Sequence, residues 1–308
     1  MSHTVLMGDP THFSVIGGAN PHTRDHYGRR KSVDRELAIR QWRGLHDLLS
    51  EHNLRIEVVP PNPKLPGLVY PANAGFRLGD DFILSNLTPT RAAEQPSYRR
   101  SVEALGLRCH EIQSRFEGEA DLFPAGDLYL FTHGQIQRQR FVPRLGWPPW
   151  RRIYGFRSEP VALDEMEAIH PLRRSVLQVL LRDERFYHGD TCLCSFGPGR
   201  QALLAYLPVL APHSAEALQR AFGERLISLE DDDAAIYAAN SFSFERKGKS
   251  FLVMPAGISA RLEEAVRAQD TLVLKIDVSE FHKKGGGSVK CMIGDLGKIP
   301  EASLACTD

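Results

Sequence analysis

The chain has 308 residues, of which 42% are hydrophobic and 25% charged, and its 38 basic residues balance 38 acidic ones. This length allows a substantial core, as one large domain or two ordinary ones. The net charge of zero excludes the strong electrostatic attraction on which nucleic-acid and anionic-membrane binding depends, and no apolar run approaches the ~20 residues of a membrane span. The N-terminus lacks the charged and apolar regions of a signal peptide, so we expect a cytoplasmic protein.

The first half of the chain predicts alternating helices and strands. Residues 33–52 carry apolar side chains at helical spacing and predict an amphipathic helix. The run "LRIEVVP" predicts a strand, and "LVYPANAGFRLGDDFILSNL" predicts two strands around a turn at residues 79–81. Residues 97–107 predict a second helix, and "CHEIQ" and "DLYLFTHG" predict two short strands.

The second half continues the same alternation. The segment "VPRLGWPPWRRIYG" predicts a loop or flap, residues 161–170 and 171–176 predict helices, and "VLQVLLRD" fits a helix or a strand. Further strands and helices are predicted in "QALLAYLPVL", "SAEALQRAFG", "RLISL", "DDDAAIYAANSFSF", "KSFLVMP", "ISARLEEAVRAQ" and "TLVLKIDV". No linker interrupts this order, so residues 1–308 are predicted to form one α/β domain of strand–helix modules. The glycine fingerprint of a doubly wound dinucleotide-binding sheet is missing.

The five cysteines are an odd number in a chain without a secretion signal, which favours free thiols. Cys192 and Cys194 form a C-x-C pair that has no second cysteine pair at zinc-ribbon spacing, and the histidines are scattered. We therefore expect no metal site and no cofactor, and we expect Cys192 and Cys194 to be structural.

Three consecutive glycines, Gly285–Gly287, stand shortly before Cys291 in "FHKKGGGSVKCMIGDLG". Glycines let the backbone adopt positive φ and approach a ligand closely, so this stretch could cradle a phosphate or present Cys291 as a nucleophile. A phosphate loop needs a fixed glycine-to-lysine spacing followed by Ser or Thr and a helix. Here the glycines are contiguous and Val289–Ile293 predicts a strand, which favours the nucleophile turn.

Four patches place polar groups where a strand end would otherwise be apolar: "YPANAGF", "RFEGEADLF", "RFYHGDTCLC" and "GGGSVKC". Together they supply a thiol, an imidazole and several carboxylates, which is the inventory of a cysteine nucleophile with a general acid and base.

The patches "FEGEAD", "YHGDTCLC" and "GGGSVKCM" resemble motifs of the guanidino-group-modifying superfamily of arginine deiminases, dimethylarginine dimethylaminohydrolases and amidinotransferases. "GDPTHFSVIGGANPHTRDHY", "PPNPKLPGLVYPANAGF" and "YGFRSEP" resemble the arginine dihydrolase branch and its close dimethylargininase-like relatives. The resemblance covers nearly the whole chain. It implies an α/β propeller (pentein) of five ββαβ-type modules around a pseudo-fivefold axis, with the site in the central channel.

The resemblance also implies the catalytic roles. Cys291 is the nucleophile, because a thiolate can attack the guanidino carbon, and His188 protonates the leaving ammonia and then activates water. Glu117 orients His188, although Glu119 and Asp121 stand close enough in sequence to compete for this role. Asp190 holds the guanidinium through charge-assisted hydrogen bonds, and Asp121 is placed among the substrate-binding residues.

Asn73 departs from the pattern, since deiminases and dimethylarginine hydrolases of the superfamily usually carry an aspartate there. An amide both donates and accepts, so it can also hold a neutral ureido group, which implies a second hydrolysis that converts citrulline to ornithine. For a substrate carboxylate, arginine is the natural clamp. Arg157 is the first candidate and Arg91 the second, and Asn20 matches another substrate-contacting position.

The favoured function is therefore a guanidine hydrolase that acts on a small molecule, with arginine dihydrolase first and arginine deiminase or dimethylargininase next. An amidinotransferase and a non-catalytic binding protein that keeps the fold are the alternatives from other classes. A homo-oligomer is left open, and each candidate residue also has a simpler interpretation as a cap, a core residue or a surface charge.

Overall fold

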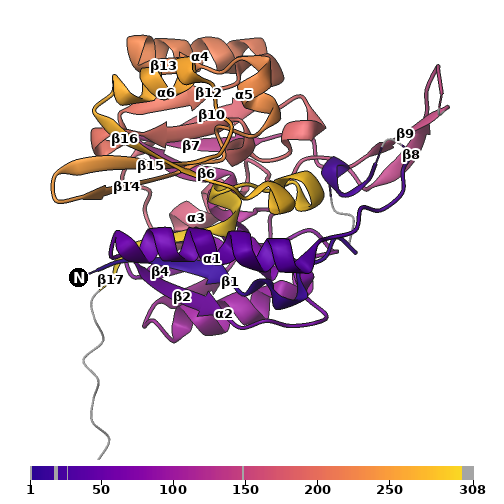
Figure 1. Ribbon diagram of the computed structural model, residues 1–308, viewed down its shortest axis with the longest axis horizontal. Coiled ribbons are helices and arrows are strands. Elements are labelled where there is room, and N and C mark those ends of the chain that lie inside the picture. The colour runs from indigo at the N-terminus through magenta and orange to yellow at the C-terminus, as the bar shows by residue number, and fades with distance from the viewer. Residues whose placement is uncertain (1, 17–19, 26, 148, 300–308) are drawn as a thin grey trace, which may run out of the picture.

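The computed structural model describes residues 2–16, 20–25, 27–147 and 149–299. Within these residues, the β-structure consists of five three-stranded sheets and one two-stranded hairpin. Each three-stranded sheet contains an antiparallel pair of strands, and its third strand runs parallel to the central one. A helix lies in sequence between the central and third strands of every sheet, so each unit has ββαβ order (Figure 1).

The strands of the five sheets, in spatial order, are as follows: β17 (Gly294–Ile299), β1 (Ser2–Gly8) and β2 (Arg55–Val59); β3 (Gly75–Leu78), β4 (Asp81–Leu84) and β5 (Arg108–Glu111); β6 (Leu122–Ala125), β7 (Leu128–His133) and β10 (Ser175–Leu180); β11 (Leu193–Phe196), β12 (Ala202–Ala205) and β13 (Leu226–Ser228); β14 (Phe242–Arg246), β15 (Lys249–Pro255) and β16 (Thr271–Ile276). The helices are α1 (Arg35–Glu51), α2 (Gln95–Glu103), α3 (Ala162–Ile169), α4 (Pro212–Phe222), α5 (Asp231–Ala235) and α6 (Ala260–Arg267).

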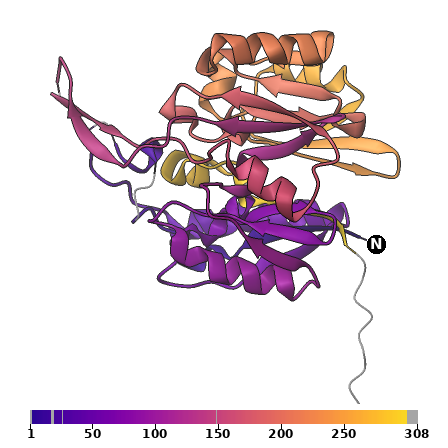
Figure 2. The same cartoon turned by 180° about the vertical axis from the view of Figure 1, so that it is seen from behind.

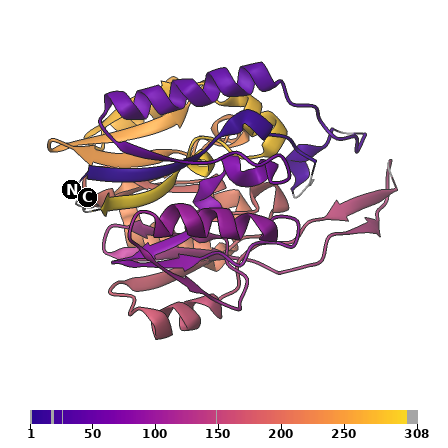
Figure 3. The ribbon, with the colours of Figure 1, turned by 90° about the horizontal axis from the view of Figure 1, so that it is seen from below.

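The first sheet joins the two ends of the chain. β17 pairs antiparallel with β1, from Ser2 opposite Ile299 to Leu6 opposite Gly294. Figure 3 shows these strands side by side beneath α1. The first module is therefore completed only when the end of the chain returns to its beginning.

The helices cover the outer faces of the sheets. α1 begins after the N-cap Asp34, whose side chain accepts a hydrogen bond from the backbone N–H of Leu37. Its buried face, which includes Leu45 and Leu49, packs in one core cluster with Val5 and Met7 of β1. Seen from behind, α4 and α2 lie at opposite outer edges of the molecule with strands between them (Figure 2).

Most of the predicted elements are present, including the helix in residues 33–52 and the strand pair around residues 79–81. The predicted helix in 171–176 is wrong, because Ser175–Leu180 is strand β10, which pairs in parallel with β7. The predicted strand through residues 289–293 is also wrong. Lys290–Met292 form a 3-10 turn, and the strand starts only at Gly294.

The segment predicted as a loop or flap is a hairpin of β8 (Arg140–Pro143) and β9 (Trp150–Ile153) that projects from the body (Figure 1). No helix in the described part of the chain is both long and apolar enough to cross a membrane.

Candidate functional site

Short turns that precede the first strand of each sheet deliver the polar side chains of the site. Asn73 and Asn240 each stand two residues before a first strand, β3 and β14. Asp190 and Cys291 each stand three residues before one, β11 and β17. These turns meet at one place although up to 218 residues separate them in sequence, since Asn73 and Cys291 line one cavity and Asn240 and Asp190 contact Cys291.

A cavity of about 460 Å³ lies at this point. The candidate residues that line it are Asn20, Asn73, Arg91, Glu117, Arg157, His188 and Cys291, together with Tyr70 and Tyr187. The structure thus brings together seven of the nine residues that the sequence analysis selected. Asp190 reaches the site through Cys291, and Asp121 lies behind it.

Cys291 is held by Asn240 and Asp190. The Asn240 amide donates from Nδ2 to the Cys291 Sγ at 3.2 Å, and its Oδ1 accepts from the backbone N–H groups of Cys291 and Ser288 at 3.1 and 2.9 Å. The Cys291 Sγ also lies 3.5 Å from Asp190 Oδ2. One asparagine therefore fixes the backbone of the turn and points a donor at the sulfur.

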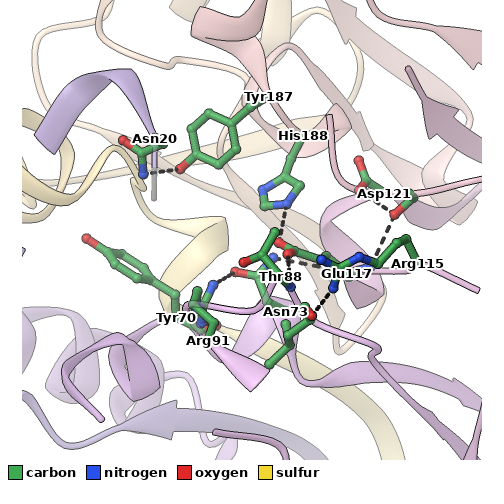
Figure 4. Close-up of polar contacts among 12 residues, drawn as sticks. Asn20, Tyr70, Asn73, Thr88, Arg91, Arg115, Glu117, Asp121, Tyr187 and His188 are labelled. Atoms are coloured by element: carbon green, nitrogen blue, oxygen red, sulfur yellow. Dashed lines mark hydrogen bonds and ion pairs between the residues drawn. The ribbon is translucent and has the colours of Figure 1, made fainter. Parts of the chain in front are cut away.

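His188 and Glu117 form a buried pair. His188 Nε2 lies 2.8 Å from Glu117 Oε2, and both side chains are 2% exposed. Glu117 Oε1 accepts from the backbone N–H of Thr88 at 3.0 Å, which fixes the carboxylate. His188 Nδ1 is buried and finds no hydrogen-bond partner among the described residues. Figure 4 shows this pair at the centre of the polar cluster.

The electrostatics of the site prepare it for a cation. Burial raises the pKa of Asp190 to about 6, and burial with the nearby Asp190 carboxylate raises the pKa of the Cys291 thiol well above its ordinary value. Burial alone would raise the pKa of Glu117, but the hydrogen bond and charge of His188 and the charges of Arg157 and Arg91 lower it below its ordinary value. A cation between Cys291 and Asp190 would oppose the effect of burial on both.

The amide of Asn73 has a defined orientation. Its Oδ1 accepts from Arg91 Nη1 at 2.6 Å, and its Nδ2 donates to the backbone carbonyl of Glu117 at 3.3 Å. Arginine only donates and a carbonyl only accepts, so the two ends of the amide cannot exchange places without losing both bonds. Figure 4 shows Asn73 between Arg91 and Glu117.

Arg91 is placed differently from a free carboxylate clamp. It lines the cavity, but its Nε and Nη2 donate to the Glu94 carboxylate at 2.7–3.1 Å and its Nη2 also donates to the Gly67 carbonyl at 3.0 Å. Its donors therefore already hold protein groups, and its guanidinium orients Asn73.

Arg157 and Asn20 lie on the cavity wall with Tyr187. The Arg157 guanidinium stands 5.2 Å from the centre of the Tyr187 ring. The Asn20 Nδ2 donates to the Tyr187 hydroxyl at 3.1 Å and to the Gly285 carbonyl at 2.7 Å. Asn20 therefore ties the N-terminal segment to the glycine turn.

The two other acids of "FEGEAD" do not face the cavity. The Asp121 carboxylate accepts from Thr132 Oγ1 and Ser158 Oγ, each at 2.6 Å, and from the backbone N–H of Gly189 at 3.0 Å. The expectation that Asp121 contacts substrate thus does not fit its position, because these protein donors already occupy both of its oxygens. Glu119 Oε2 accepts instead from Lys290 Nζ at 2.7 Å.

Asn240 is the site residue that the sequence analysis missed. Asparagine in "AANSFSF" has the ordinary appearance of a turn residue. One feature could have indicated its role: Asn240 stands two residues before its strand, at the same spacing as Asn73.

The thiols are free as predicted for Cys109, Cys192, Cys194 and Cys291, whereas Cys306 lies outside the described residues. In the described part of the chain, no three or more His, Cys, Asp or Glu side chains are grouped so that they could hold a metal ion.

Sequence comparisons find relatives over most of the chain. A family model for eukaryotic N,N dimethylarginine dimethylhydrolase matches residues 176–298. The bifunctional arginine dihydrolase/ornithine cyclodeaminase AgrE of Nostoc sp. is 33% identical over 296 residues, which are 93% of this chain and 37% of that protein. The N(G),N(G)-dimethylarginine dimethylaminohydrolase of Mycobacterium tuberculosis is 28% identical over 92% of this chain and 83% of that protein. The chain thus spans little more than a third of the bifunctional relative.

Structural comparison gives the same neighbours. The N-terminal domain of ArgZ, an arginine dihydrolase from cyanobacteria, matches with a TM-score of 0.80 and 26% identity over 96% of this chain and 98% of that one. It has been solved bound to substrate, bound to product and covalently bonded to a reaction intermediate. A dimethylarginine dimethylaminohydrolase matches with a TM-score of 0.69 at 20% identity, which shows a common fold.

Proposed function

The chain belongs to the guanidino-group-modifying superfamily, and from that premise we propose that it is a cysteine-dependent arginine dihydrolase. The proposed overall reaction is arginine plus two water molecules to ornithine, carbon dioxide and two ammonia molecules. The observation that carries the proposal is the arrangement of Cys291, His188 and Asp190 at one cavity, with the oriented Asn73 amide on its wall.

Two buried atoms without partners support a guanidinium as the ligand. Asp190 Oδ1 and His188 Nδ1 are both buried without a hydrogen-bond partner among the described residues. Leaving such groups unpaired costs about 1–3 kcal/mol each. A planar cation with several N–H donors would pair with the Asp190 carboxylate, and its leaving nitrogen would come within reach of His188.

In the proposed mechanism, the approaching guanidinium stabilises the Cys291 thiolate, and Asn240 Nδ2 donates to the sulfur. The thiolate attacks the guanidino carbon, forming a C–S bond, and one C–N bond then breaks as His188 protonates the departing ammonia. His188, oriented by Glu117, next takes a proton from water, which attacks the same carbon and breaks the C–S bond to give the ureido product and restore the thiolate. A second round releases the second ammonia and the carbon dioxide.

The orientation of Asn73 supports that second round. Arg91 occupies the amide oxygen and the Glu117 carbonyl accepts from the amide nitrogen, so the second N–H of Nδ2 remains as a donor. A donor on the cavity wall suits the oxygen of a ureido group. An aspartate at this position would present acceptors only, which suits a cationic guanidinium better than its neutral product.

The proposal extends to the fold. We infer one domain with the five ββαβ units arranged as a propeller around a pseudo-fivefold axis. Three observations support this arrangement: the repeated strand order, the pairing of β17 with β1, and the convergence of equivalent turns at one cavity.

Product analysis with arginine tests the function. We expect two ammonia molecules and one ornithine for each arginine consumed, and we expect citrulline to be a substrate. Asn73→Asp should accumulate citrulline and use added citrulline about ten- to a hundredfold more slowly, because a stranded buried partner costs about 1–3 kcal/mol. The matched control Asn62→Asp, outside the cavity lining, should keep the wild-type product ratio. Wild-type protein that stops at citrulline, or that ignores arginine, would disprove the dihydrolase assignment.

The covalent step is tested separately. Wild-type protein denatured during turnover should carry a substrate-derived mass on the peptide that contains Cys291. Cys291→Ser should lose activity by several powers of ten with an unchanged circular dichroism spectrum, because a hydroxyl is far less ionised than a thiol. Cys109→Ser, which changes a thiol on β5, should behave as wild type. A Cys291→Ser variant with full activity would exclude the proposed nucleophile.

Dimethylargininase activity is the second candidate, favoured by the family model that matches residues 176–298. Release of dimethylamine from dimethylarginine at a higher kcat/KM than the release of ammonia from arginine would establish it in place of the first.

A further inference from the structure

The hairpin that projects from the body has an unusual position in the fold. We call residues 138–147 and 149–153 the arm, which contains β8 and β9. Its two strands pair with each other from Arg140 opposite Ile153 to Pro143 opposite Trp150, and they join no other strand in the described structure. Figures 1 to 3 all show it standing away from the sheets. An isolated two-stranded hairpin is at best marginally stable in water, so it benefits from a surface to pack against.

The arm exposes large apolar side chains. Leu145 is fully exposed, Trp147 is 85% exposed, and Phe141 and Trp150 are about half exposed or more. Among the described residues, eight large hydrophobic side chains are exposed, and six of them lie in the arm or in the N-terminal loop beside its base, where the other two are Ile16 and Tyr27. Clustered exposed aromatic side chains on an otherwise well-covered protein mark an interaction surface.

The arm is also strongly basic. It contains five arginines and no acidic residue. Arg138, Arg140, Arg151 and Arg152 form no ion pair with any described acidic residue. Arg152 instead packs over the Phe141 and Tyr154 rings at 5.7 and 5.3 Å. Arginine and tryptophan are the residues most enriched at the energetic centres of interfaces.

The charge of the rest of the chain is complementary to that of the arm. With five of the 38 basic residues in the arm, the remainder has 33 basic against 38 acidic residues. The chain thus consists of a basic arm and an acidic body whose charges cancel, and the body of a second copy is complementary to the arm. We propose that the arm is a self-association element that packs its aromatic and arginine side chains against the body of a second copy of this chain.

The arm is linked to the cavity. Just beyond the arm, the backbone N–H groups of Tyr154 and Gly155 donate to the Glu184 carboxylate at 3.1 and 2.8 Å, and Arg157 follows on the cavity wall. Ile16, exposed in the neighbouring loop, also lines the cavity. The interface would therefore form beside the cavity mouth, and association should lower the KM for substrate. The association itself does not depend on which guanidino compound is used.

Sedimentation velocity over a range of protein concentrations tests the proposal. We expect a reversible dimer or larger symmetric oligomer that weakens at high salt. The double variants Leu145→Ser/Trp147→Ser and Arg138→Glu/Arg151→Glu should each raise the dissociation constant about tenfold or more, as expected for central interface residues. Circular dichroism should show that both keep the fold.

Matched controls remove the same kinds of side chain elsewhere. Leu272→Ser removes an exposed leucine from β16, and Arg43→Glu/Arg173→Glu reverses two exposed arginines outside the arm. Both controls should associate as tightly as wild type. Wild-type protein that remains monomeric at every concentration, or arm variants that associate as tightly as the controls, would overturn the proposal.

Discussion

The Asp190 carboxyl is buried and incompletely hydrogen-bonded, and both properties disfavour its ionised form. It is 3% exposed, and one of its carboxylate oxygens lacks a hydrogen-bond partner among the described residues. Burial raises the pKa of this carboxyl from 3.8 to about 6, despite the nearby charges of His188 and Lys290. The free protein therefore holds a carboxylate whose ionised form is destabilised until a cation arrives.

We predict that Asp190→Asn stabilises the protein while it removes activity. A carboxyl whose folded pKa is raised contributes most stability below its unfolded pKa near 3.8, and this contribution is lost as the pH rises through about 6. At pH 8 the variant should thus unfold at a higher temperature than wild type, with a free energy of unfolding higher by about 3 kcal/mol. This difference should shrink below pH 5.

Thermal unfolding at pH 5 and pH 8 measures this effect, with the exposed Asp232→Asn as control. Wild-type kcat/KM should also fall as the pH drops below about 6, because protonated Asp190 cannot pair with a cation. Equal stability of Asp190→Asn and wild type at pH 8 would contradict the prediction.

At the scale of single residues, the sequence was informative where a motif carries its own chemistry. Cys291, His188 and Glu117 were located from short motifs, and the structure brings them to one cavity. The surroundings of Arg91 and Asp121 could not be foreseen, because Glu94, Thr132 and Ser158 occupy their polar atoms only after folding. Asn240 was missed because its partners, Asp190 and Cys291, lie about 50 residues away on either side.

The glycine turn is the element that positions the nucleophile. A π-helix, Phe281–Gly285, leads into it, and Gly286 has a φ of 79°, which favours glycine. A Cβ on Gly285 would lie 1.8 Å from the Tyr70 hydroxyl, and one on Gly287 would lie 2.8 Å from the Cβ of Cys291. The contiguous glycines therefore let the turn pass close to Tyr70 and to the nucleophile itself.

We predict that Gly287→Ala displaces Cys291 and lowers kcat about ten- to a hundredfold, since a displacement near 1 Å from attack geometry can have that effect. The matched control is Gly44→Ala in α1, where a Cβ meets only the end of Ile276 at 3.4 Å and where alanine favours the helix. Steady-state kinetics and thermal unfolding distinguish the two. Full activity in Gly287→Ala would mean that the turn does not need the missing side chain.

At the element scale, amphipathic helices were predictable, whereas two of the short first strands, β6 and β11, were not. The periodicity of α1, α4 and α6 appears in their sequences. The strands β6 and β11 were not recognised, because each has four residues and directly follows a polar turn, so neither alternation nor length identifies it. The arm was expected as a flap because its prolines and aromatic residues hide the strand pattern.

For the whole molecule, a buried ion pair links the residue before the nucleophile to the wall of a second cavity. The segments that carry Glu117 and Cys291 continue to Glu119 and Asp295, which line another cavity of about 540 Å³. Lys290 Nζ donates to Glu119 Oε2 at 2.7 Å and to the Ile293 carbonyl at 2.8 Å. No sequence pattern could reveal this pair, because it forms only when residues 171 positions apart meet.

We predict that breaking this pair from one side destabilises the fold more than removing both partners. Burial alone would lower the pKa of Lys290, but the charges of Glu119, Asp295 and Asp190 raise it, so the ammonium stays charged beside its partner. Glu119→Gln keeps the shape of the side chain but removes the carboxylate that faces the buried Lys290 ammonium. This should lower the free energy of unfolding by about 3–5 kcal/mol. In Glu119→Gln/Lys290→Met no buried ammonium remains, so the loss should be smaller than that of Glu119→Gln alone.

Chemical denaturation of the two variants measures the difference in stability. Glu263→Gln, which breaks an exposed pair with Lys275, serves as a control that should change stability little. A double variant at least as unstable as Glu119→Gln would show that the pair stabilises the protein through packing and not by neutralising a charge at its centre.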